Sequence, residues 1–219
     1  MMWPSQLVIM RHGEADGTNK TVEEIRAAGS ANQRFPLTEF GRQQALVAGE
    51  YVRERFGSFD AVFTSSFLRA QETAGLLKLD REAVIDVRVD EWWRGIWYVL
   101  TNEEIRNRYP EEFLIRQTLG WFHYRPIGGE SAQDVEMRIH SFAAYLREAY
   151  AGKKVLVVGH GNWQLLFWRI MTNATVAEAE KVYQTSRFEN TSIALYEDHG
   201  RSLELVENRI VPWQGKIFR

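Results

Sequence analysis

The sequence predicts an α/β fold: a mostly parallel sheet with helices on both faces and a small helical insertion. Strand-length apolar runs alternate along the chain with segments whose apolar residues recur at helical spacing. Parallel neighbours need crossover helices, so this alternation favours a parallel sheet. A hydrophobic content of 45% with 26% charged residues excludes a disordered chain. The length of 219 residues fits a single domain over 1–219.

The chain begins with a strand and a polar linker. Residues 7–10 are an apolar run suited to a buried strand. Residues 14–36 follow as a polar stretch that we expect to form a linker or lid. Within it, Thr21 and Glu24 have the spacing of a capping box, which predicts a brief helix stopped by Gly29.

Two helices and two strands are expected next. Thr38 is placed to cap a longer helix with small and apolar residues on one face, and Gly57 ends it. Residues 61–64 form a second strand-sized apolar run. Apolar residues then repeat at helical spacing over 67–77, and the alternation over 84–89 predicts a third strand.

The stretch from about 92 to 127 has a different composition. It holds nine of the 28 aromatic residues of the chain, which is about twice the average density. Thr101 and Glu104 form another capping box, and Pro110 interrupts the helical pattern. We therefore predict a helical insertion with an aromatic core of its own. We also expect it to form a lid over the strand ends, with some of its rings facing a pocket there.

The last part of the chain returns to alternating strands and helices. The expected elements are a helix from Ser131 to Gly152, a strand over 154–158, a helix over 162–171, and strands over 192–197 and 203–206.

Composition narrows the possible partners and location. Lys and Arg number 27 against 29 Asp and Glu, and the resulting charge of −2 provides no global field for nucleic acid or an anionic membrane. The absence of cysteine excludes disulfides and thiolate nucleophiles and favours a reducing compartment. The N-terminal residues lack the features of a signal peptide or membrane span, so we expect a cytoplasmic protein.

Charged and imidazole side chains follow the expected strands. Ligands of such sheets bind beyond the carboxyl ends of the strands. The residues at these positions are Arg11-His12-Gly13, Ser65 to Arg69, Glu91, and Gly159-His160-Gly161. Two histidines, two arginines and a carboxylate are thus expected at one edge of the sheet. The other histidines, His123, His140 and His199, lack metal-ligand spacing, so neither a metal nor a cofactor is expected.

Five short blocks occur in order between residues 11 and 161, and the similarity that they carry spans residue 7 to about residue 197. Arg11-His12-Gly13-Glu14 follows the first strand, and Gly159-His160-Gly161 follows a late one. The other blocks are Leu37-Thr38 with Gly41 and Ala45, Thr64-Ser65 with Arg69-Ala70 and Thr73-Ala74, and Gly128-Gly129-Glu130-Ser131. Together they resemble the histidine phosphatase superfamily, also called phosphoglycerate-mutase-like. The insertion is more similar to the phosphatase branch than to the mutase branch.

The residue types suit attack on a phosphate monoester. Neutral His12 offers a nitrogen lone pair to phosphorus and forms a phosphohistidine. Arg11 and Arg69 present planar donor forks to phosphate oxygens, and His160, protonated while phosphate is bound, adds a charged donor. Gly13 and Gly161 are expected to let the backbone approach the anion.

The acid and the remaining phosphate contacts rest on the resemblance. Glu91 lies four residues before Gly95, as the acidic residue of the superfamily stands before a glycine, with Asp90 as the fallback. It would protonate the leaving alcohol and then activate water. A phosphate-contacting asparagine is common after the first block, and Thr18 and Asn19 stand at that point here.

These observations predict a metal-independent phosphomonoesterase that acts on a small phosphate ester. A phosphoglycerate mutase is the alternative enzyme, and a non-catalytic phosphate- or phosphoprotein-binding module is the alternative of another class. The module would be expected if Glu91 pointed away from the pocket. Arg106, Arg108, Arg116 and Arg125 of the insertion are expected to be mainly solvent-facing helix charges.

Overall fold

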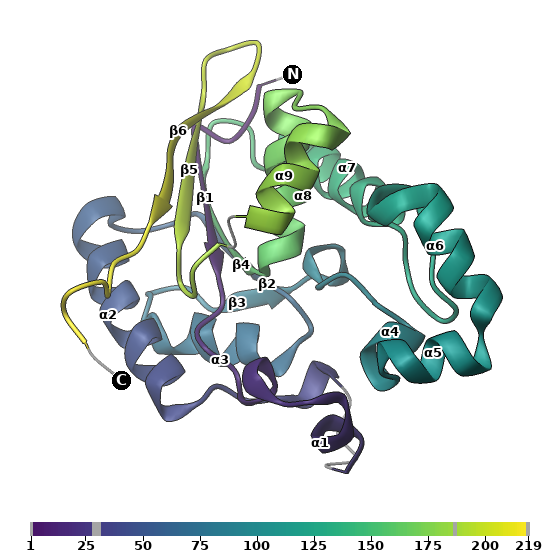
Figure 1. Ribbon diagram of the computed structural model, residues 1–219. Helices are drawn as coiled ribbons and strands as arrows, with labels where there is room; N and C mark the ends of the chain where they lie inside the picture. Colours follow the sequence, from purple (N-terminus) through teal and green to yellow (C-terminus); the bar gives the residue numbers. More distant parts are fainter. Residues whose placement is uncertain (1, 28–31, 186–187, 218–219) are drawn as a thin grey trace.

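A computed structural model describes residues 2–27, 32–185 and 188–217 of the chain (Figure 1). The strands are β1 (Gln6–Arg11), β2 (Ala61–Thr64), β3 (Ala83–Ile85), β4 (Lys154–Gly159), β5 (Ile193–Asp198) and β6 (Leu203–Ile210). The α-helices are α1 (Val22–Ala27), α2 (Glu39–Phe56), α3 (Leu68–Leu76), α4 (Ile96–Val99), α5 (Asn102–Arg108), α6 (Pro110–His123), α7 (Ala132–Ala149), α8 (Gly161–Thr172) and α9 (Val176–Thr185). Short 3₁₀ turns are η1 (Asp16–Asn19), η2 (Asn32–Arg34) and η3 (Val87–Val89).

The strands form one mixed sheet in the order β3-β2-β4-β1-β5-β6. The first four strands of this order are parallel, and β5 and β6 are antiparallel to their neighbours. The predicted α/β class with a mostly parallel sheet is confirmed. In the parallel pairing of β1 with β4, Arg11 lies opposite Gly159, so the chain leaves both strands at the same level.

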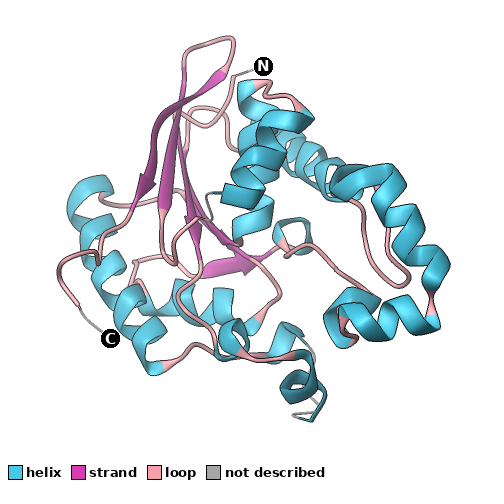
Figure 2. Ribbon diagram, viewed as in Figure 1, coloured by secondary structure: helices cyan, strands magenta, loops and turns pink. Residues whose placement is uncertain are grey.

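Helices cover both faces of this sheet (Figure 2). Along β1, Val8 and Met10 belong to the apolar core formed with α2 and α3, whereas Leu7 and Ile9 belong to the core formed with α7 and α8. Because side chains of a strand alternate between faces, the continuous apolar run at 7–10 is explained by burial on both sides.

Helix starts follow the predicted caps. The Thr38 hydroxyl accepts from the Gly41 N–H at the start of α2, and Gly57 ends this helix. Capping boxes at Thr101 and Ser131 begin α5 and α7. Thr21 and Glu24 exchange both capping hydrogen bonds at α1, while the predicted stop at Gly29 lies outside the described residues.

The third strand is shorter than predicted. The alternation over 84–89 suggested one strand, but β3 ends at Ile85 and the chain then forms η3. The reason is Asp86, whose carboxylate accepts from the Arg88 N–H at 2.9 Å and from the Arg88 guanidinium. These local hydrogen bonds compete with strand pairing. Helix α9 was not predicted.

The insertion between η3 and α7 contains α4, α5 and α6, as the aromatic-rich stretch predicted (Figure 1). Pro110 is the first residue of α6, where a missing N–H costs no helical hydrogen bond. Trp121 of α6 stacks on Tyr183 of α9, with ring centroids 5.3 Å apart. No helix in the described parts of the chain is long and apolar enough to cross a membrane.

Candidate active site

The two predicted histidines meet at the carboxyl edge of the sheet. His12 follows β1 and His160 follows β4, and the register of these strands makes the two residues neighbours. Their ring centroids are 5.0 Å apart with an interplanar angle of 63°. Both side chains are buried, at 4% and 1% exposure. Residues 148 positions apart in the chain thus form one site.

The guanidinium of Arg69 lies between the two rings. Its Nε donates to His12 Nε2 at 3.1 Å, and its Nη2 lies 3.4 Å from His160 Nδ1. The remaining nitrogen, Nη1, donates to the backbone and side-chain oxygens of Asn32. The face of the Phe67 ring lies beneath this guanidinium, 4.7 Å from its Cζ. Arg69 is therefore held on three sides in a fixed orientation.

Hydrogen bonds define the tautomer of His12. Its Nδ1 lies 2.6 Å from the carbonyl oxygen of Gly13, which can only accept, so Nδ1 carries the proton. Nε2 then has the free lone pair, which accepts from Arg69. Burial, followed by the charges of Arg69 and Arg11, lowers the pKa of His12 well below 6.5. The ring is thus neutral, with the lone pair of Nε2 beside the Arg69 guanidinium.

His160 is also neutral in this arrangement. Burial is the largest cause of a pKa well below 6.5, and the charge of Arg69 is the next. Its Nε2 lies 2.8 Å from the Ser65 hydroxyl, and its Nδ1 lies 4.0 Å from a carboxylate oxygen of Glu91.

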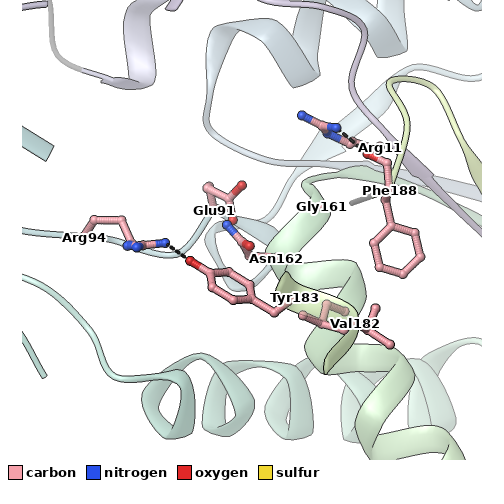
Figure 3. Close-up of a pocket in the computed structure, with 9 residues that line it drawn as sticks. Arg11, Glu91, Arg94, Gly161, Asn162, Val182, Tyr183 and Phe188 are labelled. Carbon is pink, nitrogen blue, oxygen red and sulfur yellow. Dashed lines mark hydrogen bonds between the residues drawn. The ribbon is translucent and has the colours of Figure 1, made fainter. Parts of the chain in front are cut away.

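A cavity of about 220 Å³ opens beside these residues (Figure 3). Its lining includes Arg11 and Gly161 at the ends of β1 and β4, and Glu91 after η3. Arg11 is oriented by a hydrogen bond from its Nη1 to the carbonyl oxygen of Phe188. On the other side, Arg94 and Tyr183 are joined by a hydrogen bond of 2.9 Å. The cavity has room for the alcohol part of an ester.

Glu91 and Asp90 occupy different environments. Glu91 lines the cavity, and its Oε1 accepts from the Trp92 N–H at 2.9 Å. Asp90 is buried and accepts hydrogen bonds from Ser65 and Ser66. Of the two carboxylates, only Glu91 is placed to exchange a proton with a bound ligand.

Comparisons with known proteins agree with this geometry. A family model of the histidine phosphatase superfamily (branch 1) matches residues 7–210. The chain belongs to this superfamily. A 2,3-bisphosphoglycerate-dependent phosphoglycerate mutase of Allorhizobium ampelinum is 32% identical over 170 residues, which cover 71% of this chain and 74% of that protein.

Solved structures of the superfamily share the fold. YhfR of Bacillus stearothermophilus superposes with a TM-score of 0.75 at 25% identity, covering 94% of this chain and 97% of that one. A mycobacterial glucosyl-3-phosphoglycerate phosphatase in complex with VO3 gives a TM-score of 0.69 at 25% identity, covering 92% and 96%. Both phosphatases and mutases therefore occur among the relatives of this histidine phosphatase superfamily member.

The two glycines predicted to approach the anion differ. The N–H of Gly13 donates to Thr73 Oγ1 at 3.0 Å, so it is not free for phosphate. A Cβ on Gly13 would lie 2.5 Å from the carbonyl oxygen of Gly41, which shows that packing against α2 requires this glycine. Gly13 thus also serves to pack the loop that carries His12 against α2. Gly161 begins α8 and lines the cavity, and its approach to an anion stays a prediction.

Several residues at the site were not predicted from the sequence. Asn32 contacts Arg69 from the predicted linker, where only proximity in the fold identifies it. Arg94 and Tyr183 come from the insertion and from α9, and neither belongs to a recognisable motif. The side chains of Thr18 and Asn19 lie outside the described part of the structure. Among the described residues, no group of three or more His, Asp or Glu side chains is placed to hold a metal.

Proposed function

We propose that this superfamily member is a metal-independent phosphomonoesterase that forms a phosphohistidine on His12. The observation that carries the proposal is the hydrogen bonding of that ring. Gly13 holds the proton on Nδ1, and Nε2 is left with a lone pair beside the Arg69 guanidinium. A phosphate dianion drawn to Arg69 and Arg11 would meet this lone pair directly, and the nucleophile needs no deprotonation.

The reaction then proceeds in two steps. His12 Nε2 forms a bond to phosphorus while the bond to the ester oxygen breaks, and Glu91 gives its proton to the departing oxygen. In the second step a water molecule attacks the phosphohistidine, the carboxylate of Glu91 takes a proton from this water, and phosphate leaves His12. Arg11, Arg69 and a protonated His160 would stabilise charge on the transferred group.

The position of Glu91 argues against a purely binding role. The carboxylate faces the cavity and lies 4.0 Å from His160 instead of pointing away. A mutase remains the alternative, because curated relatives include phosphoglycerate mutases. The two activities differ in whether water or a second hydroxyl group receives the phosphoryl group.

The decisive experiment compares His12→Ala with His199→Ala. His199 is an exposed histidine at the opposite end of β5 from the site, so its variant is a matched control. Wild type and His199→Ala should release phosphate from p-nitrophenyl phosphate and from several other monoesters, with or without a chelator. His12→Ala should lose this turnover, and acid-labile phosphohistidine should be trapped only in proteins that keep His12.

Two results would contradict the proposal. Loss of activity on chelation would show a metal-dependent reaction. Isomerisation of a phosphoglycerate without release of phosphate would assign the mutase reaction instead.

A further inference from the structure

Behind His160, on the side away from Glu91, lies a pair of buried side chains. Ser65 follows β2 and Asp90 follows η3, with 0% and 5% exposure. The Ser65 hydroxyl lies 2.8 Å from His160 Nε2 and 2.8 Å from Asp90 Oδ1. A hydrogen-bonded chain therefore runs from the carboxylate through the hydroxyl to the imidazole.

The direction of each hydrogen bond follows from the number of protons. A serine hydroxyl carries one proton, and Ser65 donates it to Asp90, whose carboxylate oxygen accepts. The oxygen of Ser65 then has only lone pairs left, one of which accepts from the Phe67 N–H at 3.1 Å. The other lone pair must accept from His160, so the ring proton is on Nε2. Nδ1 consequently carries the lone pair.

Asp90 is itself fixed by a neighbouring serine. It accepts from the backbone N–H of Ser66 and from the Ser66 hydroxyl, each at 2.7 Å. These bonds orient the carboxylate toward Ser65. Ser66 has no hydrogen bond to His160 among those of the described residues, so the two adjacent serines differ in this one respect.

The charged groups around His160 come from several elements. The protonation of His160 is opposed by Arg69 from α3, by His12 and Arg11 from the end of β1, and by Arg138 from α7. The carboxylate of Glu91 lies 4.0 Å from Nδ1. The Phe67 ring contacts the imidazole edge to face at 4.9 Å. A bound dianion would offset the surrounding positive charge, and the lone pair of Nδ1 is on the Glu91 side of the ring, 3.4 Å from Arg69 Nη2.

We propose that Ser65 and Asp90 are positioning residues that keep the Nε2 proton of His160 in place. Nδ1 is then the atom that takes up a proton from solvent when the dianion binds, and it donates this proton in a hydrogen bond to phosphate. The catalytic part of this inference rests on the proposed phosphatase reaction. Its structural part, the tautomer of the free protein, does not.

The test combines ring ¹⁵N NMR of the full chain with kinetics. Wild-type protein free of phosphate should show His160 as the Nε2–H tautomer and His12 as the Nδ1–H tautomer. Ser65→Ala removes the acceptor of the Nε2 proton, so it should mix the His160 tautomers, shift the pH profile of kcat and lower kcat for p-nitrophenyl phosphate by about 10²-fold, as expected for a misplaced catalytic group.

The matched control is Ser66→Ala, which removes a hydrogen bond to the same carboxylate without touching the imidazole. Ser66→Ala should keep the His160 tautomer and lose far less kcat than Ser65→Ala. Ser65→Thr, which keeps a hydroxyl at this position, should retain the activity that Ser65→Ala loses.

Three outcomes separate the possibilities. An Nδ1–H tautomer of His160 in the wild type would overturn the inference without any variant. Equal losses of kcat in Ser65→Ala and Ser66→Ala, with unchanged pH profiles, would reduce Ser65 to a structural role and also overturn it. A wild type that turns over no phosphate ester, yet shows the expected tautomers, would refute the proposed function and leave the arrangement of the ring proton supported.

Discussion

Arg69 contacts three separate segments of the site, which its place in a sequence motif does not reveal. Its three nitrogens contact His12 after β1, His160 after β4 and Asn32 of η2. Burial lowers the pKa of Arg69 to about 10, so the guanidinium remains charged at neutral pH although it is desolvated. Part of this desolvation would be offset by a phosphate anion.

We expect Arg69→Lys to lower kcat/KM for phosphate monoesters by about 10²–10³-fold, the usual loss for one donor to a developing oxyanion. A lysine ammonium is a compact point charge and lacks the planar fork of donors with which Arg69 contacts both imidazoles and Asn32. Steady-state kinetics would measure the effect. Arg81→Lys is a suitable control, because Arg81 donates to the backbone of Phe59 away from the cavity. Comparable losses in both variants would contradict a specific role for Arg69.

At the scale of elements, the start of α2 supports the loop that follows β1. The Thr38 hydroxyl caps the helix through the Gly41 N–H and donates to Glu14 Oε1 at 3.0 Å. A Cβ on Gly41 would lie 2.0 Å from the carbonyl oxygen of Glu14, so the helix and the loop are in backbone contact. The loop that carries His12 is thereby held against the start of α2.

Gly41→Ala should therefore destabilise the protein by about 1–3 kcal/mol, as overpacking does, and should also reduce turnover by moving the loop. Gly75→Ala is the matched control, because a Cβ there meets no atom within 4 Å in helix α3. This control should raise the free energy of unfolding by about 0.4–1 kcal/mol. Urea denaturation of both variants would check the opposite signs, and destabilisation by neither or by both would contradict the packing argument.

At the scale of the whole molecule, the two buried imidazoles make stability depend on pH. The folded pKa of each lies below 6.5, because burial and nearby arginines oppose protonation. Below that pH the unfolded chain binds more protons than the folded one. Stability from this source is complete above about pH 6.5 and is lost as the pH falls, by up to about 1.4 kcal/mol per pH unit for each ring.

A double variant, His12→Gln with His160→Gln, should show a weaker decrease of unfolding free energy between pH 6.5 and pH 5.5 than the wild type. Carboxylates contribute to both curves and cancel in the difference between them. Chemical denaturation at a series of pH values would measure this difference. Parallel curves would mean that the two histidines bind protons equally in the folded and the unfolded protein.

Much of the architecture follows from short-range patterns. Capping residues such as Thr38 and Ser131 begin helices through hydrogen bonds to the next turn, so the sequence predicts them directly. The apolar run at 7–10 likewise predicts a strand, and His12 and His160 were recognised because each follows a predicted strand. Competing local bonds, as at Asp86, explain where such predictions were wrong.

The chain itself indicated the two histidines, the two arginines and Glu91, whereas their geometry depended on the fold. His12 and His160 are neighbours because β1 pairs with β4 in one register, which is determined by packing on both faces of the sheet. The tautomers, the contact of Asn32 with Arg69 and the need for glycine at position 13 all arise between segments far apart in sequence. No local pattern encodes such contacts, because each depends on where a second segment lies once the core has formed.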